Sequence, residues 1–365
     1  MSRKVLQNTL VVLCAVGTVV AALEIFGRVI PVDSLPASLP VIVQTMRLHA
    51  DSLFRSDPYF HYITNPGVDF LFQHPEFTYR VNTKLNVGQA GFRGGTLGGP
   101  TWGVALGDSF TFGMGVEHES TWVAQLASLK RKEIMNLGVP GWGPQQYTRA
   151  LERFGPPLRP KVVLYALYRN DLQDVLHFDQ WSRDSGPKQA IEDFLRIHSI
   201  TFNLFRILAV ANVNQGKEAI LLDNFEFEFN HKKVTQALLD DRDRFAAAWA
   251  ITKKEIERAI DYSQSMSATF VLIYLPSKDE AYWEFIRQKD VRLKSYDDSA
   301  DILRSRIPEF CKARRIRCLD LTPAFRLKAA QGRRLYYSHD SHLNKEGNRV
   351  AAEEIGGYLL AEDIT

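Results

Sequence analysis

The chain has 365 residues, with 45 Lys and Arg against 42 Asp and Glu, so its formal net charge is +3. Hydrophobic residues make up 45% of the sequence and charged residues 24%, which is typical of a globular protein and excludes a largely disordered one. The near balance of charge argues against nucleic acid as a partner, because neutralising phosphates requires an excess of basic residues. Three cysteines without a C-x-x-C spacing are too few for a disulfide scaffold and predict no structural zinc site.

The N-terminal segment is typical of a membrane-spanning helix. Val5 to Leu23 contains no charged residue, and as a helix it rises about 28 Å, close to the thickness of the hydrocarbon core of a bilayer. Arg3 and Lys4 precede it, which predicts that the N-terminus stays in the cytoplasm while the rest of the chain lies outside. Glu24 and Arg28 follow at an i,i+4 spacing and can pair near the outer interface.

A cleaved signal peptide is the competing interpretation of this segment. Its apolar region would span roughly 7–15 residues before a small-residue cleavage site, and no clean site follows here. Cys14 is not a lipobox cysteine, because Leu13 stands where a small residue is expected. A buried core helix would explain neither the N-terminal position nor the basic flank. We therefore predict an uncleaved signal anchor over residues 1–30, single-pass in the inner (plasma) membrane, with a periplasmic body.

Residues 31–100 are predicted to form a stalk and a lead-in segment. Three prolines punctuate the stalk, Pro31, Pro36 and Pro40. A short amphipathic stretch from Val41 to Phe54 follows, and Tyr59 to Gly95 mixes aromatic and turn residues, which predicts short strands. The glycines between Gly91 and Gly99 precede a strand and lack a following Lys-Ser/Thr, so hairpin turns are favoured over a phosphate-binding loop.

Residues 101–365 alternate between strand and helix patterns. The predicted strands are Gly103–Gly107, Ile134–Val139, Lys161–Tyr168, Thr269–Leu275 and Ile316–Leu321. The predicted helices are Thr121–Lys132, Gln145–Phe154, Arg244–Ser265, Asp297–Lys312 and Lys345–Leu360. Such alternation predicts an α/β domain with three α/β/α layers, in which helices cover both faces of a parallel five-stranded sheet.

An insertion at about residues 172–243 interrupts this alternation. It contains an apolar stretch from Ile191 to Val210 and alternating Phe and Glu from Phe225 to Phe229. We favour an extra helix packed on the domain. A lid or a membrane-facing wall beside the active site is the alternative.

Polar residues with complementary chemistry follow four of the predicted strands. In an open α/β sheet, ligands bind outside the carboxyl ends of the strands. Ser109 follows the first strand in a Gly-Asp-Ser sequence, Gly141 follows the second, Asn170 follows the third, and the last strand leads to Asp340 and His342. Each motif alone is common in turns. Four of them in this order on alternating β/α units are a strong signal of a functional site.

These residue types suit acyl transfer. A serine at a strand-to-helix junction needs a base to remove its proton, and His342 oriented by Asp340 supplies one. The tetrahedral oxyanion needs preorganised donors, which the N–H groups of Ser109 and Gly141 and the side-chain amide of Asn170 can provide.

With these residues in place, the chain resembles the SGNH (GDSL-type) hydrolase superfamily from about Trp102 to Leu360, apart from the insertion. The resemblance implies a flavodoxin-like α/β/α fold, with Ser109 as nucleophile, Gly141 and Asn170 in the oxyanion hole and His342 as base.

Two positions depart from the pattern of that superfamily. Tyr168 replaces the glycine of the third block, which predicts a narrower or reshaped pocket. The last block, usually Asp-x-x-His, is one residue shorter here, from Asp340 to His342. With the Leu-Asn-x-x-Gly that follows, this variant resembles a bacterial subgroup with N-terminal membrane anchors.

Metal catalysis is the weaker interpretation of the histidines. His339, Asp340 and His342, or His177 with Asp174, could be read as ligands, but no H-E-x-x-H or comparable cluster supports this. We predict neither a metal nor another cofactor.

Two arginines and two cysteines leave alternatives open. Arg93 and Arg169 could bind an anionic substrate group, although solvated or structurally paired side chains are favoured. Cys311 and Cys318 flank the last helix–strand connection; export permits a disulfide, but two buried thiols are favoured.

The sequence thus predicts a membrane-anchored serine esterase that acts on O-acyl esters, with acetyl groups on envelope polysaccharide as the candidate substrate. An O-acyltransferase with the same residues and a non-catalytic binding module of an envelope assembly complex are the alternatives. The intact set of Ser109, Gly141, Asn170 and His342 argues against the last of these.

Overall fold

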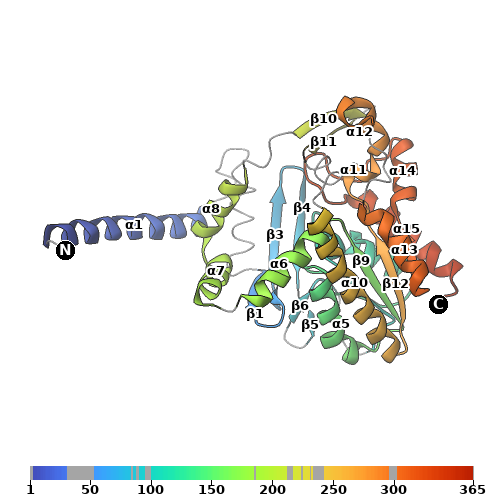
Figure 1. Cartoon of the computed structure of the whole chain (residues 1–365). Helices are drawn as coiled ribbons and strands as arrows, with labels where there is room; N and C mark the ends of the chain where they lie inside the picture. Colours follow the sequence, from blue (N-terminus) through green and yellow to red (C-terminus); the bar gives the residue numbers. More distant parts are fainter. Residues whose placement is uncertain are drawn as a thin grey trace.

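We describe the protein from a computed structural model. The structure describes residues 3–30, 53–83, 85–87, 90–94, 100–184, 186–211, 217–222, 225–230, 232, 242–295 and 302–364. The predicted stalk and nearly all of the amphipathic stretch after it lie outside these residues. Helix α1 (Arg3–Val29) extends away from the body of the molecule (Figure 1), and its residues are mostly exposed. Its segment Gln7–Val29 is long and apolar enough to cross a membrane.

A five-stranded parallel sheet forms the centre of the body, as predicted. Its strand order is β13-β12-β9-β7-β8. The strands are β7 (Gly103–Leu106), β8 (Ile134–Asn136), β9 (Val162–Leu167), β12 (Thr269–Tyr274) and β13 (Arg317–Asp320). All side chains of the central strand β9 are buried, which explains why its sequence is a continuous apolar run rather than an alternating one.

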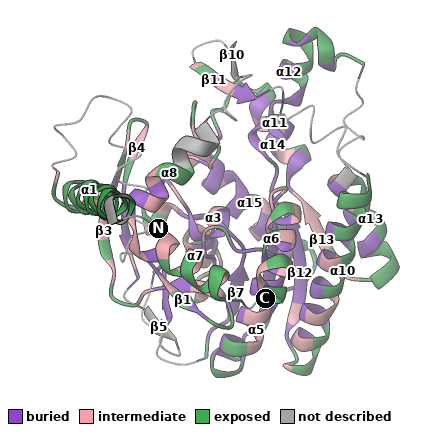
Figure 2. Cartoon of the chain, turned by 60° about the vertical axis from the view of Figure 1, so that its left-hand side comes forward, coloured by how far each residue is buried: buried purple, intermediate pink, exposed green. Residues whose placement is uncertain are grey.

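Helices cover both faces of the sheet and complete the three predicted layers. One face packs against α5 (Pro144–Leu158), α10 (Arg242–Ser265) and α13 (Ile302–Arg314). The other packs against α4 (Trp122–Lys130), α11 (Lys278–Ala281), α12 (Trp283–Lys289), α14 (Thr322–Ala330) and α15 (Lys345–Ala361). The buried strands between these helices appear in purple in Figure 2. Two short 3-10 helices, His118–Ser120 and Val291–Leu293, lie in connections.

The lead-in segment forms the short strands that were predicted. They pair as three antiparallel hairpins, β1 (Phe54–Asp57) with β2 (His61–Thr64), β3 (Asp69–His74) with β4 (Phe77–Asn82), and β5 (Leu85–Val87) with β6 (Ala90–Phe92). These hairpins belong to the core of the body. Phe60 is fully buried and stacks on Trp142 with the ring centroids 4.8 Å apart, and Tyr79 and Phe92 are also fully buried.

The insertion contains more structure than the single extra helix that was favoured. It comprises α6 (Asp171–Arg183), α7 (Pro187–His198), α8 (Ile200–Ala211), β10 (Lys217–Leu222) and β11 (Phe225–Asn230). The apolar stretch is divided between α7 and α8, which meet at Ser199. In β11, Phe227 and Phe229 are buried while Glu226 is exposed, which accounts for the alternating sequence.

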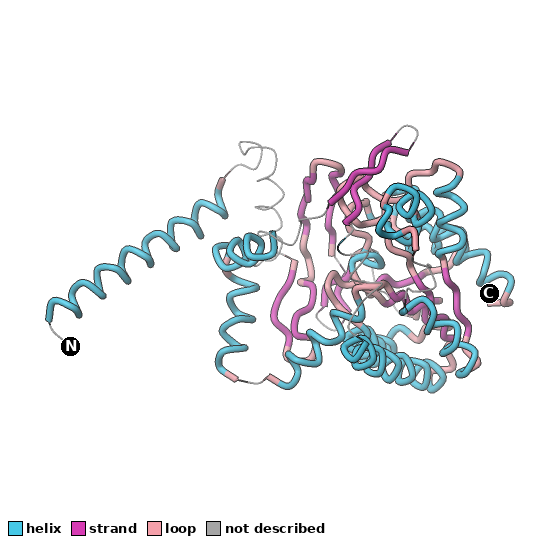
Figure 3. Tube along the Cα trace, turned by 45° about the horizontal axis from the view of Figure 1, so that its top comes forward, coloured by secondary structure: helices cyan, strands magenta, loops and turns pink. Residues whose placement is uncertain are grey.

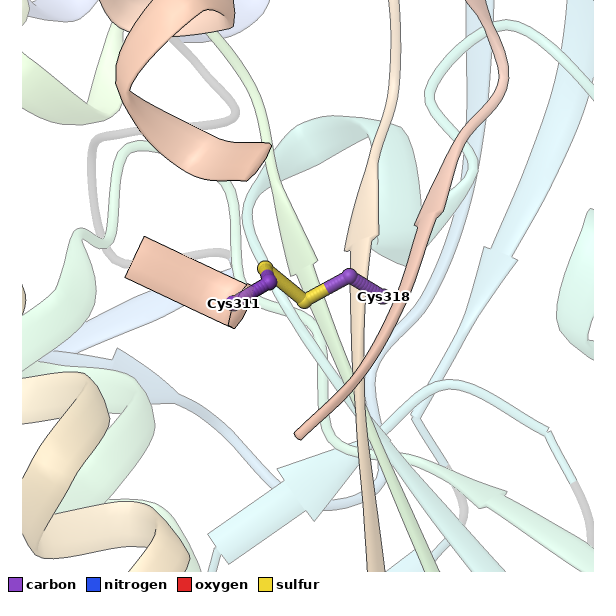
Figure 4. The surroundings of a disulfide bond; sticks show 2 residues. All are labelled: Cys311 and Cys318. Carbon is purple, nitrogen blue, oxygen red and sulfur yellow. A yellow bond between two sulfur atoms is a disulfide. The ribbon is translucent and has the colours of Figure 1, made fainter. Parts of the chain in front are cut away.

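Cys311 and Cys318 form a disulfide (Figure 4), so the expectation of two buried thiols is wrong. Helix α13 ends at Arg314, and Arg315 adopts a left-handed φ of 53°, which reverses the chain into β13. The reversal brings the two Cα atoms to 6.3 Å, within the range that a disulfide can bridge. Sequence separation alone could not reveal this geometry.

Candidate active site

The segment after β7 presents Ser109 at the start of a short helix. Helix α3 (Ser109–Phe112) is only four residues long. The carboxylate of Asp108 caps it by accepting the backbone N–H of Phe110 at 2.9 Å. Gly113 ends it with a left-handed φ of 83°. The Gly-Asp-Ser sequence therefore builds a tight turn that fixes the position of the serine hydroxyl.

Ser109, His342 and Asp340 are joined by hydrogen bonds. Oγ of Ser109 lies 2.9 Å from Nε2 of His342, and Nδ1 of the same ring lies 2.7 Å from Oδ1 of Asp340. That carboxylate oxygen also accepts the backbone N–H of His342 at 2.7 Å. Two bonds to one oxygen fix the imidazole relative to the carboxylate, so the short Asp-x-His spacing orients the ring directly. The geometry is that of a nucleophile, a base and an orienting acid.

The electrostatics of this group favour an ion pair between histidine and aspartate. Burial alone would lower the pKa of His342, but the charge of Asp340 and its hydrogen bond outweigh burial and raise that pKa above 6.5. Burial alone would raise the pKa of Asp340, but the charge and hydrogen bonds of His342 reverse the effect and lower it. A base with a raised pKa is well suited to take the proton of Ser109.

Gly141 needs the conformation that only glycine adopts easily. Its φ is +76°, and a Cβ there would lie 2.6 Å from the hydroxyl of Tyr62. Tyr62 in turn donates to the carbonyl of Pro140 at 3.0 Å. The end of β8 is linked to α3 by Asn136, whose side-chain amide donates to the carbonyl of Thr111 at 2.7 Å.

Asn170 lies close to the nucleophile turn. Its side-chain amide donates to the carboxyl of Asp174 at 2.9 Å and interacts with Asp108. Burial and the charge of Asp108 raise the pKa of Asp174 to about 8, so this carboxyl is largely protonated near neutral pH. An amide carries two N–H groups, and here they serve Asp174 and Asp108, so Asn170 would stabilise an oxyanion by exchanging one of these partners for it.

Aromatic rings form one side of the site. The ring of Phe110, next to Ser109, stacks on Tyr168 at 3.9 Å and lies 5.0 Å from the imidazole of His342. Tyr168 is buried, and its large ring occupies space that a glycine would leave open. The narrower or reshaped pocket expected at this position stays a prediction.

The other candidate residues have structural partners. The guanidinium of Arg93 is buried and donates to the carbonyls of Phe112, Gly113 and Val116. Arg169 pairs with Asp279 at 3.4 Å. Both findings agree with the structural pairing that was favoured.

The residues considered as metal ligands have other partners in the structure. His339 pairs with Glu228 at 2.9 Å, whereas Asp174 faces Asn170. Among the described residues, no group of three or more His, Cys, Asp or Glu side chains could hold a metal ion.

Two charged residues that the sequence did not single out also reach the site. Glu76, at the tip of the β3–β4 hairpin, and Lys278, in α11, both bind the backbone beside Asp340. In the catalytic segment they bind backbone groups, which leave no pattern of residue types in the sequence; Glu76 also pairs with Arg334 at 3.7 Å.

A comparison with protein families shows the family of the chain. The sequence profile of the GDSL-like Lipase/Acylhydrolase family matches residues 105–350. The chain belongs to this family. It is therefore an ester-hydrolysing enzyme with the SGNH-type α/β fold, as its sequence predicted.

Solved structures and curated proteins add little to the family assignment. The esterase resembles an acetyl xylan esterase (15% identity, TM-score 0.40, covering 70% of this chain and 98% of that one). It also resembles the psychrotrophic esterase EstA of a Pseudoalteromonas species (13% identity, TM-score 0.38, covering 72% of this chain and 98% of that one). A family 3 carbohydrate esterase of Clostridium thermocellum is similar as well (12% identity, TM-score 0.36, covering 71% of this chain and 96% of that one). At these levels the neighbours do not identify a substrate. A search of curated proteins finds no match.

Proposed function

We propose that the protein is a membrane-anchored serine esterase that removes small O-acyl groups outside the cytoplasm. The observation that carries this proposal is the pair of contacts from His342, to Oγ of Ser109 at 2.9 Å and to Asp340 at 2.7 Å. The proposed substrate class is O-acetylated envelope polysaccharide.

The proposed reaction proceeds through an acyl-enzyme. Oγ of Ser109 attacks the ester carbonyl while Nε2 of His342 takes its proton, and Asp340 stabilises the imidazolium. The N–H groups of Ser109 and Gly141 and the amide of Asn170 stabilise the oxyanion. The C–O bond to the alcohol then breaks, and His342 returns its proton to the departing oxygen. Water, deprotonated by His342, attacks the acyl-serine, so that the carboxylic acid is released and the serine is restored.

Three features support small acyl groups and an extracytoplasmic location. The stacked rings of Phe110 and Tyr168 occupy space beside the nucleophile, which favours acetyl over long acyl chains. The apolar segment Gln7–Val29, preceded by Arg3 and Lys4, supports an anchor with its N-terminus in the cytoplasm. The Cys311–Cys318 disulfide is compatible with an oxidising compartment.

The serine mechanism is tested with a fluorophosphonate probe and p-nitrophenyl esters. The wild-type esterase should be labelled and should hydrolyse the acetyl ester faster than the octanoyl ester. Ser109→Ala should lose labelling and turnover, and His342→Ala should lose turnover to the same extent, because the two residues act as a unit. Turnover that persists in Ser109→Ala would refute the proposed nucleophile.

The substrate and the location need separate measurements. We expect acetate release from O-acetylated envelope polysaccharide, and no transfer to an added sugar acceptor. The full chain should remain with membranes after carbonate extraction. Recovery in the soluble fraction would refute the anchor, and acyl transfer in place of hydrolysis would refute the esterase assignment.

A further inference from the structure

The backbone between the last strand and the last helix needs partners outside any helix or sheet. We call residues 337–342 the catalytic loop, because it carries Asp340 and His342. An antiparallel bridge between Tyr336 and Leu343 closes its base. Its residues belong to no helix or strand, so its backbone N–H and C=O groups must find partners elsewhere.

Glu76 satisfies three successive N–H groups of the catalytic loop. One of its carboxylate oxygens accepts the N–H of Ser338 at 2.6 Å, and the other accepts those of His339 at 2.9 Å and Asp340 at 2.8 Å. Successive amides that converge in this way form a concave site for an anion. Here a side chain from the β3–β4 hairpin fills that site.

Lys278 binds the carbonyl groups of the same loop. Its Nζ donates to the carbonyls of Tyr337 at 3.1 Å, Ser338 at 2.9 Å and Asp340 at 3.0 Å. These bonds use all three donors of an ammonium group. Lys278 is 6% exposed, so its charge is held close to the loop with little access to water.

We propose that Glu76 and Lys278 are positioning residues for the catalytic base. They fix the backbone of Asp340 from two sides, and Asp340 in turn fixes His342 through both its ring and its backbone N–H. With only one residue between Asp340 and His342, a shift of the Asp340 backbone moves the imidazole directly. Glu76 lies outside the segment that the family profile matches, so the lead-in segment supplies part of the catalytic apparatus.

The test compares Glu76→Gln and Glu76→Asp in the full chain with the hairpin control Asp69→Asn. Gln offers one acceptor oxygen in place of two, so at least one loop amide loses its partner. Displacing a catalytic group by about 1 Å can lower the reaction rate by about 10²-fold. We therefore expect kcat for p-nitrophenyl acetate to fall about 10–100-fold with KM little changed. Asp keeps the charge and should restore part of the loss. Asp69 pairs with Arg80 on the same hairpin, and its variant should behave like the wild type.

A double variant separates positioning from general stability. If Glu76 acts through the Asp340–His342 pair, Glu76→Gln should cost little further turnover in an Asp340→Asn background. The pH profile of kcat/KM should also shift in Glu76→Gln, because the imidazole environment changes. Wild-type kcat and pH profile in Glu76→Gln, or a loss that adds in full to that of Asp340→Asn, would overturn the proposal. Ser109→Ala activity tests the serine mechanism independently of these outcomes.

A separate observation concerns the contact between α1 and α8. The carboxylate of Glu24 in α1 accepts the N–H groups of Ile200 at 3.1 Å and Thr201 at 2.9 Å, together with the hydroxyl of Ser199. Arg28 donates to the carbonyl of His198 at 2.7 Å. The carboxyl-terminal end of α1 therefore caps the start of α8 and holds the insertion in place.

Helices α7 and α8 of the insertion lie beside this end of α1, between α1 and the body (Figures 1 and 3). They expose large apolar side chains, namely Ile191, Phe194 and Phe205, at 60%, 59% and 61%. Basic Lys188 and Arg206 are exposed on the same two helices. Aromatic and aliphatic side chains flanked by Lys and Arg are typical of helices that lie in a membrane interface.

We infer that this apolar face of α7 and α8 sits in the outer interface of the bilayer that α1 spans. The inference rests on the proposed membrane span, because the Glu24 and Arg28 contacts place both helices where α1 leaves the hydrocarbon. The bilayer is then continuous with the surface of α1, and burial of the three apolar side chains in it is favourable.

Environment-sensitive labels in lipid nanodiscs test this inference in the full chain. Cys14 is the free cysteine of the described residues, and the other two form the disulfide. The labels are placed at Cys14 in the wild type and, in a Cys14→Ser background, at Phe194→Cys or at the control Leu360→Cys. Leu360 is 66% exposed on α15 but lies near the C-terminus, far from α1 (Figure 1).

Nitroxide-labelled lipids should quench the labels at positions 14 and 194 and spare the label at 360. Quenching at position 14 without quenching at position 194 would overturn the interfacial position of α7 and leave the membrane span intact. In that case water or another protein, not lipid, covers the apolar face of α7. No quenching at 14 would refute the span itself, and this inference with it.

Discussion

Asp340→Asn tests how the shortened Asp-x-His segment orients the base. Oδ1 of Asp340 accepts both the ring and the backbone N–H of His342, each at 2.7 Å. An asparagine can present its NH₂ to the ring in place of an oxygen, which favours the tautomer with a proton on Nε2. That tautomer cannot accept the proton of Ser109. In triads with tight geometry, such a change costs about 10⁴-fold, or about 5.5 kcal/mol of transition-state stabilisation.

The same substitution should change the pH dependence in a defined direction. In the proposed mechanism neutral His342 is the base, so kcat/KM of the wild type should rise with pH around a midpoint above 6.5, because Asp340 raises the pKa of His342. Without the carboxylate, burial dominates and lowers that pKa. The midpoint of Asp340→Asn should therefore lie below that of the wild type.

Hydrolysis of p-nitrophenyl acetate by the full chain in detergent between pH 5 and 9 measures both effects. His339→Ala is the matched control, because His339 lies on the same loop, pairs with Glu228 and has an exposed side chain. Less than about tenfold loss in Asp340→Asn, with an unchanged midpoint, would refute Asp340 as the orienting acid.

Three further changes probe the oxyanion donor, the acyl pocket and the disulfide. Asn170→Ala should lower kcat by roughly 10²–10³-fold with little change in melting temperature, and near wild-type turnover would make Asn170 a capping residue only. Tyr168→Gly should raise the octanoyl-to-acetyl ratio of kcat/KM, and an unchanged ratio would show that the ring does not limit chain length. Replacing Cys311 and Cys318 by Ala should lower the free energy of unfolding in urea by about 2.5 kcal/mol, as expected for a short loop. Equal stability of the variant and the oxidised wild type would contradict the disulfide.

The strand and helix pattern was sufficient to predict the sheet and the residues at its carboxyl edge. Buried strands such as β9 are continuous apolar runs, and Ser109 and Asn170 follow strands directly, so local sequence carries both signals. The division of the insertion at Ser199 was beyond local sequence, because Glu24 caps α8 from 175 positions away. Glu76 was equally hidden, since its carboxylate binds backbone amides, which every residue type except proline provides.

The buried guanidinium of Arg93 bears on how much of the chain is needed for activity. It satisfies carbonyl groups at the end of α3 and in the segment that follows, and its own burial lowers its pKa to about 10. A chain shortened to the start of the family match would leave those carbonyls without their donor and the loop of His342 without Glu76. The smallest catalytic unit of this esterase should therefore begin upstream of Glu76, well before the boundary that sequence families assign to it.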